Sequence, residues 1–276
     1  MRKFYKIICA IIMLCISLVF AGCEFSCSKE SAQAKGVWWW HKNLGEEYLD
    51  FAEDNGINEI YYCDYSFNND TESFISKANA KDMKVYFLAG DSAWLHDDTE
   101  LQGLIVEYIA FQEVSKFKFA GIHLDIEPHQ DDSWDEQRES LILKLIDLVY
   151  RLNNTYQDIS FDYDIPMWLN DEITYRDVSK PAYQHIIDYA DRVVVMSYRD
   201  TVEDIYEMFK DEYQYGIETS VPVLVSVETS SQEIEKVTFK EEGRDELNNA
   251  LSTLSSQVSE TLSGYAVHHI KSWYEL

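Results

Sequence analysis

Residues 121–130, GIHLDIEPHQ, bring three ionisable side chains within five positions of one another. His123, Asp125 and Glu127 alternate with aliphatic residues, as in a buried strand, so all three point to one face. Burying even one unpaired carboxylate is costly, and an inward group of two carboxylates and an imidazole therefore indicates a functional site. Neighbouring carboxyl groups suit acid–base chemistry, because the charge of Asp125 would raise the pKa of Glu127 and keep it protonated. Pro128 supplies no backbone donor and ends the strand.

The elements that must position this strand follow one rhythm of strand, polar turn and amphipathic helix. Strict alternation implies parallel strands joined by right-handed crossovers, and eight such units in about 240 residues match a single-domain α/β fold, the closed (β/α)8 TIM barrel. An open doubly wound sheet is the alternative, but residues 38–41 are WWWH where a Gly-rich phosphate loop would stand. The predicted strands are 37–41, 57–65, 84–90, 121–127, 160–168, 192–198, 221–228 and 264–270.

Helices are predicted between these strands. Asp70 is the expected cap of one helix, and Ser133 with Glu136 forms a capping box at the start of another. Residues 168–178 are expected to form a loop that holds a short helix. The predicted helices are 46–54, 70–80, 99–112, 133–152, 181–190, 202–213 and 244–262.

The N-terminus has the pattern of a secretory signal, with three basic residues before an apolar run over residues 7–20. The Ala-Gly-Cys that follows resembles a bacterial lipobox, with Phe20 where such motifs usually carry Leu, and this implies lipidation of Cys23. An uncleaved anchor, or an ordinary signal with an incidental cysteine, is the alternative. We expect a lipoprotein signal peptide over 1–22, a flexible tether over 23–35 and a barrel domain over 36–276, anchored by lipid on the extracytoplasmic face of the cell membrane.

Composition limits the partners. The formal net charge is −27, and it reaches about −30 once the three basic residues of the signal are removed. Such a field argues against nucleic acid, anionic polymers and flat binding to anionic lipid. Seven Trp and 19 Tyr exceed what a core needs and predict a surface for a flat, polar ligand. Cys27 and Cys63 could pair, but no cysteine spacing of a metal site exists.

A barrel of this type carries its site at the C-terminal ends of its strands, so polar residues there are the candidates. The sequence places many at these ends. They are His41, Asp64, Asp91, Asp125, Glu127, Asp162, Asp164, Tyr198, Arg199, Asp200, Glu228, His268 and His269.

The fourth strand resembles the signature of chitinase-type (family 18) glycoside hydrolases, Asp-Gly-x-Asp-x-Asp-x-Glu. Gly121, Asp125 and Glu127 match it, whereas Ala120 and His123 replace its two earlier aspartates. The sixth strand is similar too, since residues 196–199, MSYR, correspond to Met-x-Tyr-Asp with an arginine in place of the Asp. The chain also looks like an uncharacterised group of exported bacterial barrel lipoproteins.

The resemblance implies an O-glycosyl hydrolase with Glu127 as general acid. In that family the substrate's own acetamido group is the nucleophile, which Asp125 would orient and Tyr198 would hydrogen-bond. His123 is a departure, because pairing with Asp125 would lower the pKa of that carboxyl and weaken its effect on Glu127. A conventional two-carboxylate mechanism with Glu228 or Asp164 therefore stays open.

Six further side chains are expected to bind substrate. For Asp164 and Glu228 among them, and for Asp162, a structural or substrate-binding role and a catalytic role are equally open. The six are His123, Asp164, Glu228, Trp40, Trp168 and His268.

Three functions remain open. The first is an extracytoplasmic, lipid-anchored glycoside hydrolase-like enzyme without cofactor, acting as a monomer on carbohydrate. The second is a carbohydrate-binding barrel that has lost its chemistry. The third is a metal-dependent hydrolase that uses His268 or His269 with the fourth strand, although adjacent strand residues point to opposite faces and only one of the pair can face the barrel axis. No HExxH or three-histidine spacing supports a metal, and none is expected.

Overall fold

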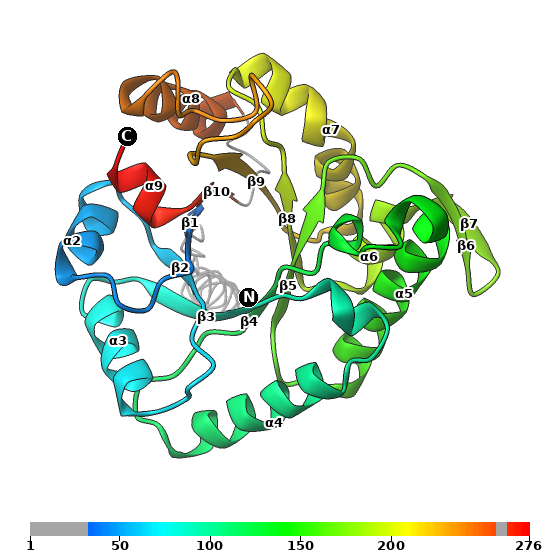
Figure 1. Cartoon of the computed structure of the whole chain (residues 1–276), viewed down its shortest axis with the longest axis horizontal. Coiled ribbons are helices and arrows are strands. Elements are labelled where there is room, and N and C mark those ends of the chain that lie inside the picture. Colours follow the sequence, from blue (N-terminus) through cyan, green and yellow to red (C-terminus); the bar gives the residue numbers. More distant parts are fainter. Residues whose placement is uncertain (1–32, 258–263) are drawn as a thin grey trace, which may run out of the picture. The chain divides into compact units, whose positions relative to one another are not determined.

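The computed structural model describes residues 33–257 and 264–276, and within them eight parallel strands close into a barrel. The strand order is β1-β10-β9-β8-β5-β4-β3-β2, and β1 pairs with both β2 and β10. Helices surround the barrel in the view of Figure 1. All eight strands predicted from the sequence are present, and the (β/α)8 prediction is confirmed. They are β1 (Ala34–Trp39), β2 (Glu59–Tyr62), β3 (Lys84–Ala89), β4 (Ile122–Leu124), β5 (Phe161–Pro166), β8 (Arg192–Met196), β9 (Val223–Glu228) and β10 (Gly264–His268).

The seven helices predicted from the sequence are present, and a short helix over Ile270–Tyr274 that was not predicted follows β10. They are α2 (Glu46–Asp54), α3 (Asn69–Asn79), α4 (Thr99–Val114), α5 (Trp134–Thr155), α6 (Ala182–Tyr189), α7 (Val202–Thr219), α8 (Arg244–Gln257) and α9 (Ile270–Tyr274), with short 3₁₀ turns η1 (Ser92–Leu95) and η2 (Pro128–Gln130).

Two predicted helix caps are wrong. Asn68, not Asp70, caps α3, because its extended backbone lets its side chain accept from the amides of Asp70 and Thr71. The predicted capping box at α5 does not form. Its Ser133 hydroxyl donates instead to Asp131 Oδ1 at 2.5 Å, so its side chain is not available to the helix amides.

The short helix expected within residues 168–178 is also wrong. That segment contributes to an antiparallel hairpin of β6 (Glu172–Tyr175) and β7 (Val178–Pro181). Ile173 is buried while its neighbours Glu172 and Thr174 are exposed, so the period is two and not that of a helix. Arg176 and Asp177 make the turn with φ of 51° and 66°.

Strand parity divides the core into two clusters. Ile122, Leu124 and Ile126 of the fourth strand pack outward in the large cluster that the helices cover. A smaller cluster fills the barrel, and it contains Trp38 but not Trp39. The inner members are Ala34, Trp38, Tyr61, Tyr86, Leu88, Val194, Leu224 and Ala266, with Trp40 and Cys63 packed against them.

The N-terminal expectations fall mostly outside the described residues. The signal, Cys23 and Cys27 all lie there, and Cys63 has a free thiol. Ala34 and Lys35, ascribed above to the tether, begin strand β1, where Ala34 pairs with Gly264 of β10. Across residues 33–257 and 264–276, every helix is too short or too polar to span a membrane.

Candidate functional site

Ionisable side chains inside the barrel form two levels. The lower level is closed to solvent: the His123 side chain is 0% exposed, and its ring stacks on Tyr61 with centroids 3.8 Å apart. His123 Nε2 lies 2.9 Å from Asp164 Oδ2, and His123 Nδ1 lies 3.7 Å from Asp162 Oδ2. Trp38 Nε1 also donates to Asp164, at 3.2 Å. We call these groups, with Arg192 and Glu59 below them, the floor network.

Arg192 supplies the permanent cation of the floor network. Its guanidinium donates to Glu59 Oε2 at 2.7 Å and to Asp162, and it lies over the Tyr86 ring. Burial by itself would lower the pKa of His123, but the charges and hydrogen bonds of Asp164 and Asp162 outweigh it and raise that pKa to about 9. The floor network therefore sets two cations against three carboxylates.

His123 thus corrects one expectation from the sequence. The partners of its imidazole are Asp164 and Asp162 on β5, because β4 and β5 are paired with His123 directly opposite Asp162. Asp125 was the expected partner, yet it lies one inward position higher on the strand. Neither His123 nor Asp164, both expected to bind substrate, lines the pocket above.

The upper level is an open pocket of about 560 Å³ at the C-terminal ends of β4, β5, β8, β9 and β10. It gathers seven of the residues predicted from the sequence. They are Asp125, Glu127, Trp168, Tyr198, Arg199, Glu228 and His268. Polar and aromatic residues at the C-terminal ends of β4, β5, β8, β9 and β10 therefore share one pocket, as the sequence predicted for strand ends.

Glu127 presents an acid poised near neutral pH to this pocket. Its side chain is 26% exposed, and burial followed by the negative charge of Asp164 raises its pKa to about 7, against an opposing effect of His268. We expected the charge of Asp125 to be the cause. Asp125 is not among the causes, and burial and the charges of Asp164 and Glu127 raise its own pKa well above the usual range, which favours its neutral form.

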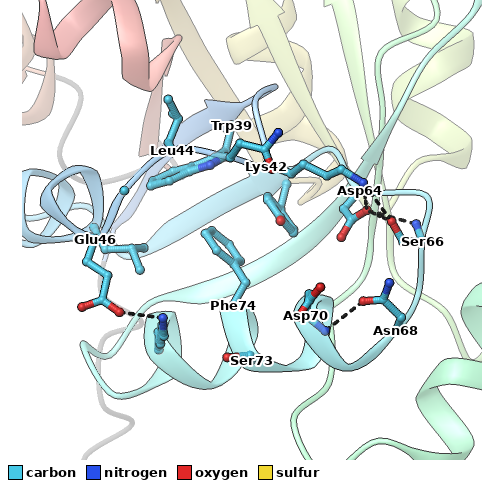
Figure 2. A pocket seen from close by; sticks show the side chains of 15 residues that line it. Trp39, Lys42, Leu44, Glu46, Asp64, Ser66, Asn68, Asp70, Ser73 and Phe74 are labelled. Atoms are coloured by element: carbon cyan, nitrogen blue, oxygen red, sulfur yellow. Dashed lines mark hydrogen bonds and ion pairs between the residues drawn. The ribbon is translucent and has the colours of Figure 1, made fainter.

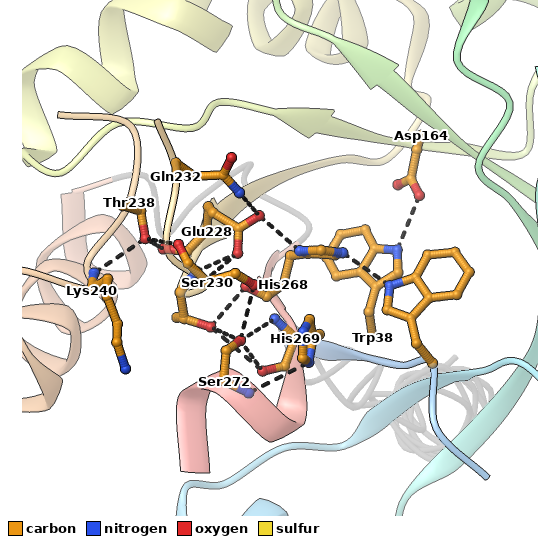
Figure 3. A network of polar contacts seen from close by, with 12 residues as sticks. Trp38, Asp164, Glu228, Ser230, Gln232, Thr238, Lys240, His268, His269 and Ser272 are labelled. Carbon is orange, nitrogen blue, oxygen red and sulfur yellow. Dashed lines mark hydrogen bonds and ion pairs between the residues drawn. The ribbon is translucent and has the colours of Figure 1, made fainter. Parts of the chain in front are cut away.

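Glu228 is the opposite kind of carboxyl. Its Oε1 accepts from the amides of Thr229 and Ser230 at 2.7 and 2.6 Å, and its Oε2 lies 2.9 Å from His268 Nδ1 (Figure 3). Gln232 adds a further donor at 3.2 Å. Burial raises the pKa of Glu228, but the hydrogen bond and charge of His268 and the Ser230 donor outweigh it and lower that pKa, so Glu228 is a buried anion stabilised by protein hydrogen bonds.

His268 links Glu228 to the first strand. Trp40 Nε1 donates to His268 Nε2 at 2.9 Å, so the imidazole is held between an indole and a carboxylate. His269 turns away from the pocket, where its side chain caps α9 by accepting from the Ser272 amide, and burial and His268 lower its pKa to about 4. As strand parity predicted, only one histidine of the pair faces the pocket.

An aromatic wall closes one side of the pocket. Trp168 lies 5.1 Å from Trp134 between ring centroids, and the Arg138 guanidinium covers both rings at 5.3 and 5.0 Å. His129 meets Trp168 edge to face at 5.0 Å and places its Nε2 3.2 Å from Glu127 Oε2. Flat indole faces of this kind suit sugar rings.

Sequence reasoning missed His129 and Gln232 as pocket residues. His129 carried a usable signal, because it continues the alternation of His123, Asp125 and Glu127 by one more step of two residues. Gln232 sits in an irregular segment after β9, for which no periodicity exists.

Other predicted strand-end residues serve local structure. Asp91 caps η1 through the Ala93 amide. Asp64 accepts hydrogen bonds from the Thr71 hydroxyl and from the hydroxyl and backbone amide of Ser66, and Lys42 Nζ lies 3.6 Å from Asp64 Oδ1. Asp64, Ser66 and Lys42 line a second pocket of about 270 Å³ at the ends of β1 and β2 (Figure 2). The polar groups of that smaller pocket thus pair with one another. Over the residues that the structure describes, no cluster of three His, Cys, Asp or Glu side chains could hold a metal ion.

Comparison with known proteins establishes the fold. No protein-family model matches this sequence, and no curated protein does. Among solved structures, a chitinase from Bacteroides thetaiotaomicron matches with a TM-score of 0.55 at 14% identity, covering 87% of this chain and 90% of that one. A chitinase from Chromobacterium violaceum matches at 0.51 and 12%, covering 88% and 97%.

The spore cortex-lytic enzyme SleL of Bacillus cereus also matches, with a TM-score of 0.51 at 12% identity, covering 88% of this chain and 73% of that one. At such identities the likeness concerns the backbone. This chain is a TIM barrel similar to those of chitinase-type glycoside hydrolases, as the resemblance in its fourth strand predicted.

Proposed function

We propose that this protein is a glycoside hydrolase in which Glu127 is the general acid. One observation carries the proposal: Asp125 and Glu127 enter the same pocket as Tyr198, with the pKa of Glu127 raised to about 7. An acid with that pKa is still substantially protonated at neutral pH and can protonate the leaving oxygen of a glycosidic bond. The likeness to glycoside hydrolase barrels and the indole wall at Trp168 support a sugar substrate.

Asp125 acts as the neutral partner of Glu127 in this proposal. A protonated carboxyl can donate a hydrogen bond, either to a substrate acetamido group or to a second carboxylate. Tyr198 has its pKa raised well above the usual range by burial and by the charge of Glu228, so it stays a phenol that can donate as well. Glu228 supplies the fixed negative charge that an oxocarbenium-like transition state needs.

Replacement of Glu127 by Gln tests the proposal. In a screen of chitin-type, peptidoglycan-type and plain hexose oligosaccharides, E127Q should lose about 10²–10⁴-fold of the hydrolysis rate while still binding the substrate. Glu212 provides a matched control, since it is a buried carboxyl of α7, outside the pocket, whose pKa burial also raises to about 7. Glu212→Gln should retain the rate. Equal hydrolysis by E127Q and wild type would remove Glu127 from the mechanism, and binding without products in the wild type would favour a carbohydrate-binding barrel.

The lipid anchor is part of the same proposal. It rests on the lipobox-like sequence that ends at Cys23. Cells grown with an alkyne-tagged fatty acid should label the wild-type chain and not Cys23→Ser, which should leave the membrane fraction. Label that persists in Cys23→Ser would refute lipidation at this residue.

A further inference from the structure

Arg199 is a cation without a carboxylate partner at the edge of the pocket. Its guanidinium makes one hydrogen bond, from Nη1 to the backbone oxygen of Tyr198 at 2.7 Å, and it forms no ion pair anywhere in residues 33–257 and 264–276. Arg138, Arg151 and Arg192 each pair with a carboxylate. Arg176 and Arg244 also form no ion pair within these residues, but they contact the Tyr150 ring and backbone oxygens outside the pocket, so Arg199 is the one arginine of the described lining and it lacks a carboxylate partner.

The carboxyl groups around Arg199 do not compensate it. Glu228 already accepts from two backbone amides, His268 and Gln232. Asp125 and Glu127 are shifted toward their neutral forms by burial and by Asp164. The described lining therefore holds one arginine, no lysine and no carboxylate that is left free to pair with that arginine.

We propose that Arg199 binds a carboxylate carried by the sugar, so that the substrate is a glycan with an acidic sugar residue at this position. The proposal rests on the function proposed above and narrows its substrate class. The planar guanidinium has unused donors that match a carboxylate in a bidentate arrangement, which an ammonium would not provide. A single acidic group suffices for this contact.

The overall charge selects among acidic glycans. A formal net charge of −27 repels, at long range, a polymer that is anionic at every sugar. A glycan with fewer charges is repelled less, and its carboxylate can then contact Arg199 at short range. The fitting ligand alternates neutral and acidic sugars. Its carboxylate comes either from a lactyl ether, as in N-acetylmuramic acid, or from a hexuronic acid.

Binding to matched glycans tests the inference. We would use the full chain carrying Glu127→Gln, so that no substrate is consumed. The probes are an N-acetylglucosamine–N-acetylmuramic acid tetrasaccharide and a glucuronic acid–N-acetylglucosamine tetrasaccharide, each free and with its carboxylates converted to amides. With Arg199 present, at least one free tetrasaccharide should bind about 10- to 100-fold more tightly than its amide. The tetrasaccharide that shows this ratio identifies the source of the carboxylate.

Variants of Arg199 assign the effect to this side chain. Arg199→Gln should bring the ratio of the two dissociation constants to about one, and Arg199→Lys should give an intermediate ratio because it keeps the charge without the fork. Arg176→Gln removes one positive charge from the β6–β7 turn, outside the pocket, and should keep the wild-type ratio. Thermal unfolding of each variant verifies that it is folded. Equal binding of acid and amide with Arg199 present, or no binding of either pair, overturns the inference.

Hydrolysis by the wild type separates this inference from the proposed function. Turnover of glycans without preference for the free carboxylate leaves the glycosidase standing and removes the role of Arg199. An Arg199-dependent binding preference without turnover by the wild type keeps the role of Arg199 and removes the proposed glycosidase activity.

Discussion

The floor network and the pocket use the same residue types to different ends. Both contain carboxylates, at least one imidazole and one arginine, and His123 and Asp125 stand only two residues apart. In the floor network Arg192 and His123 lie between three carboxylates, and the histidine is 0% exposed. In the pocket the pKa values of Asp125 and Glu127 stay raised, because burial and the charge of Asp164 outweigh the opposing charges of His123 on Asp125 and of His268 on Glu127.

The difference shows how a barrel separates stability from chemistry. Buried charges that compensate one another are costly to separate, because removing one partner leaves the other without compensation, so they cannot readily exchange protons with a substrate. Carboxyls that lack compensation retain raised pKa values, and they are the groups able to deliver a proton near neutral pH. The two levels therefore predict opposite responses to the same substitutions.

The largest effect is expected from the two arginines. Arg192→Met leaves Glu59 and Asp162 without their cation inside the barrel and should lower the free energy of unfolding by about 3–5 kcal/mol. Arg199→Met removes an arginine that has no carboxylate partner and should change it by less than about 0.5 kcal/mol. Urea unfolding of both variants measures the contrast, and equal losses would show that the two networks do not differ in compensation.

A smaller contrast is expected for the aspartates. Asp164→Asn weakens the contacts to the His123 imidazolium and should lower the free energy of unfolding by about 1.5–3 kcal/mol. Asp125 has a pKa raised above its unfolded value, so its contribution to stability is lost as pH rises above that unfolded value. Asp125→Asn should therefore be more stable than wild type at pH 7 yet hydrolyse substrate more slowly. Destabilisation by Asp125→Asn would mean that Asp125 belongs to the floor network.

The sequence predicted the barrel well because its signals were redundant. Eight strands with matching helices between them leave few other topologies, and strand parity correctly placed His123 and Asp125 toward the barrel axis. Local hydrogen-bond competition was harder to foresee. Asn68 rather than Asp70 caps α3, since the choice depends on backbone angles that composition does not encode.

The site was only partly predictable for a related reason. Parity shows which side chains point inward but not how deep each lies along the axis, and depth decides whether a carboxyl pairs or stays free. His123 and Asp164 were expected at the substrate and lie in the floor network instead, where their side chains are 0% exposed and contact each other at 2.9 Å. Burial, followed by the charge of Asp164 and not of Asp125, raises the pKa of Glu127 to about 7.

A further contrast is expected between the pH dependence of hydrolysis, which the pocket sets, and that of the free energy of unfolding, to which the floor network contributes. The active form of Glu127 is protonated, so kcat/KM should fall about tenfold per pH unit above about pH 7. His123 has a folded pKa of about 9, above its unfolded value, so its stabilisation is complete below the unfolded pKa and is lost as pH rises toward 9. Hydrolysis rates and urea unfolding across pH 5–9 test this order. A rate that stays constant up to pH 9 would exclude Glu127 as the acid.

The smallest effect concerns His129, which lies beside the acid but outside the floor network. Its Nε2 is 3.2 Å from Glu127 Oε2, and its buried Nδ1 has no partner, so the ring is held by Trp168 and this one contact. His129→Ala should lower kcat by several-fold to about tenfold with little change in KM, because the glutamate loses its orientation and not its chemistry. His129→Gln can replace the Nε2 contact through its amide and should recover most of kcat. A loss of the same size in both variants, or a change confined to KM, would assign His129 to packing against Trp168. The Nε2 contact of His129 would then not orient Glu127.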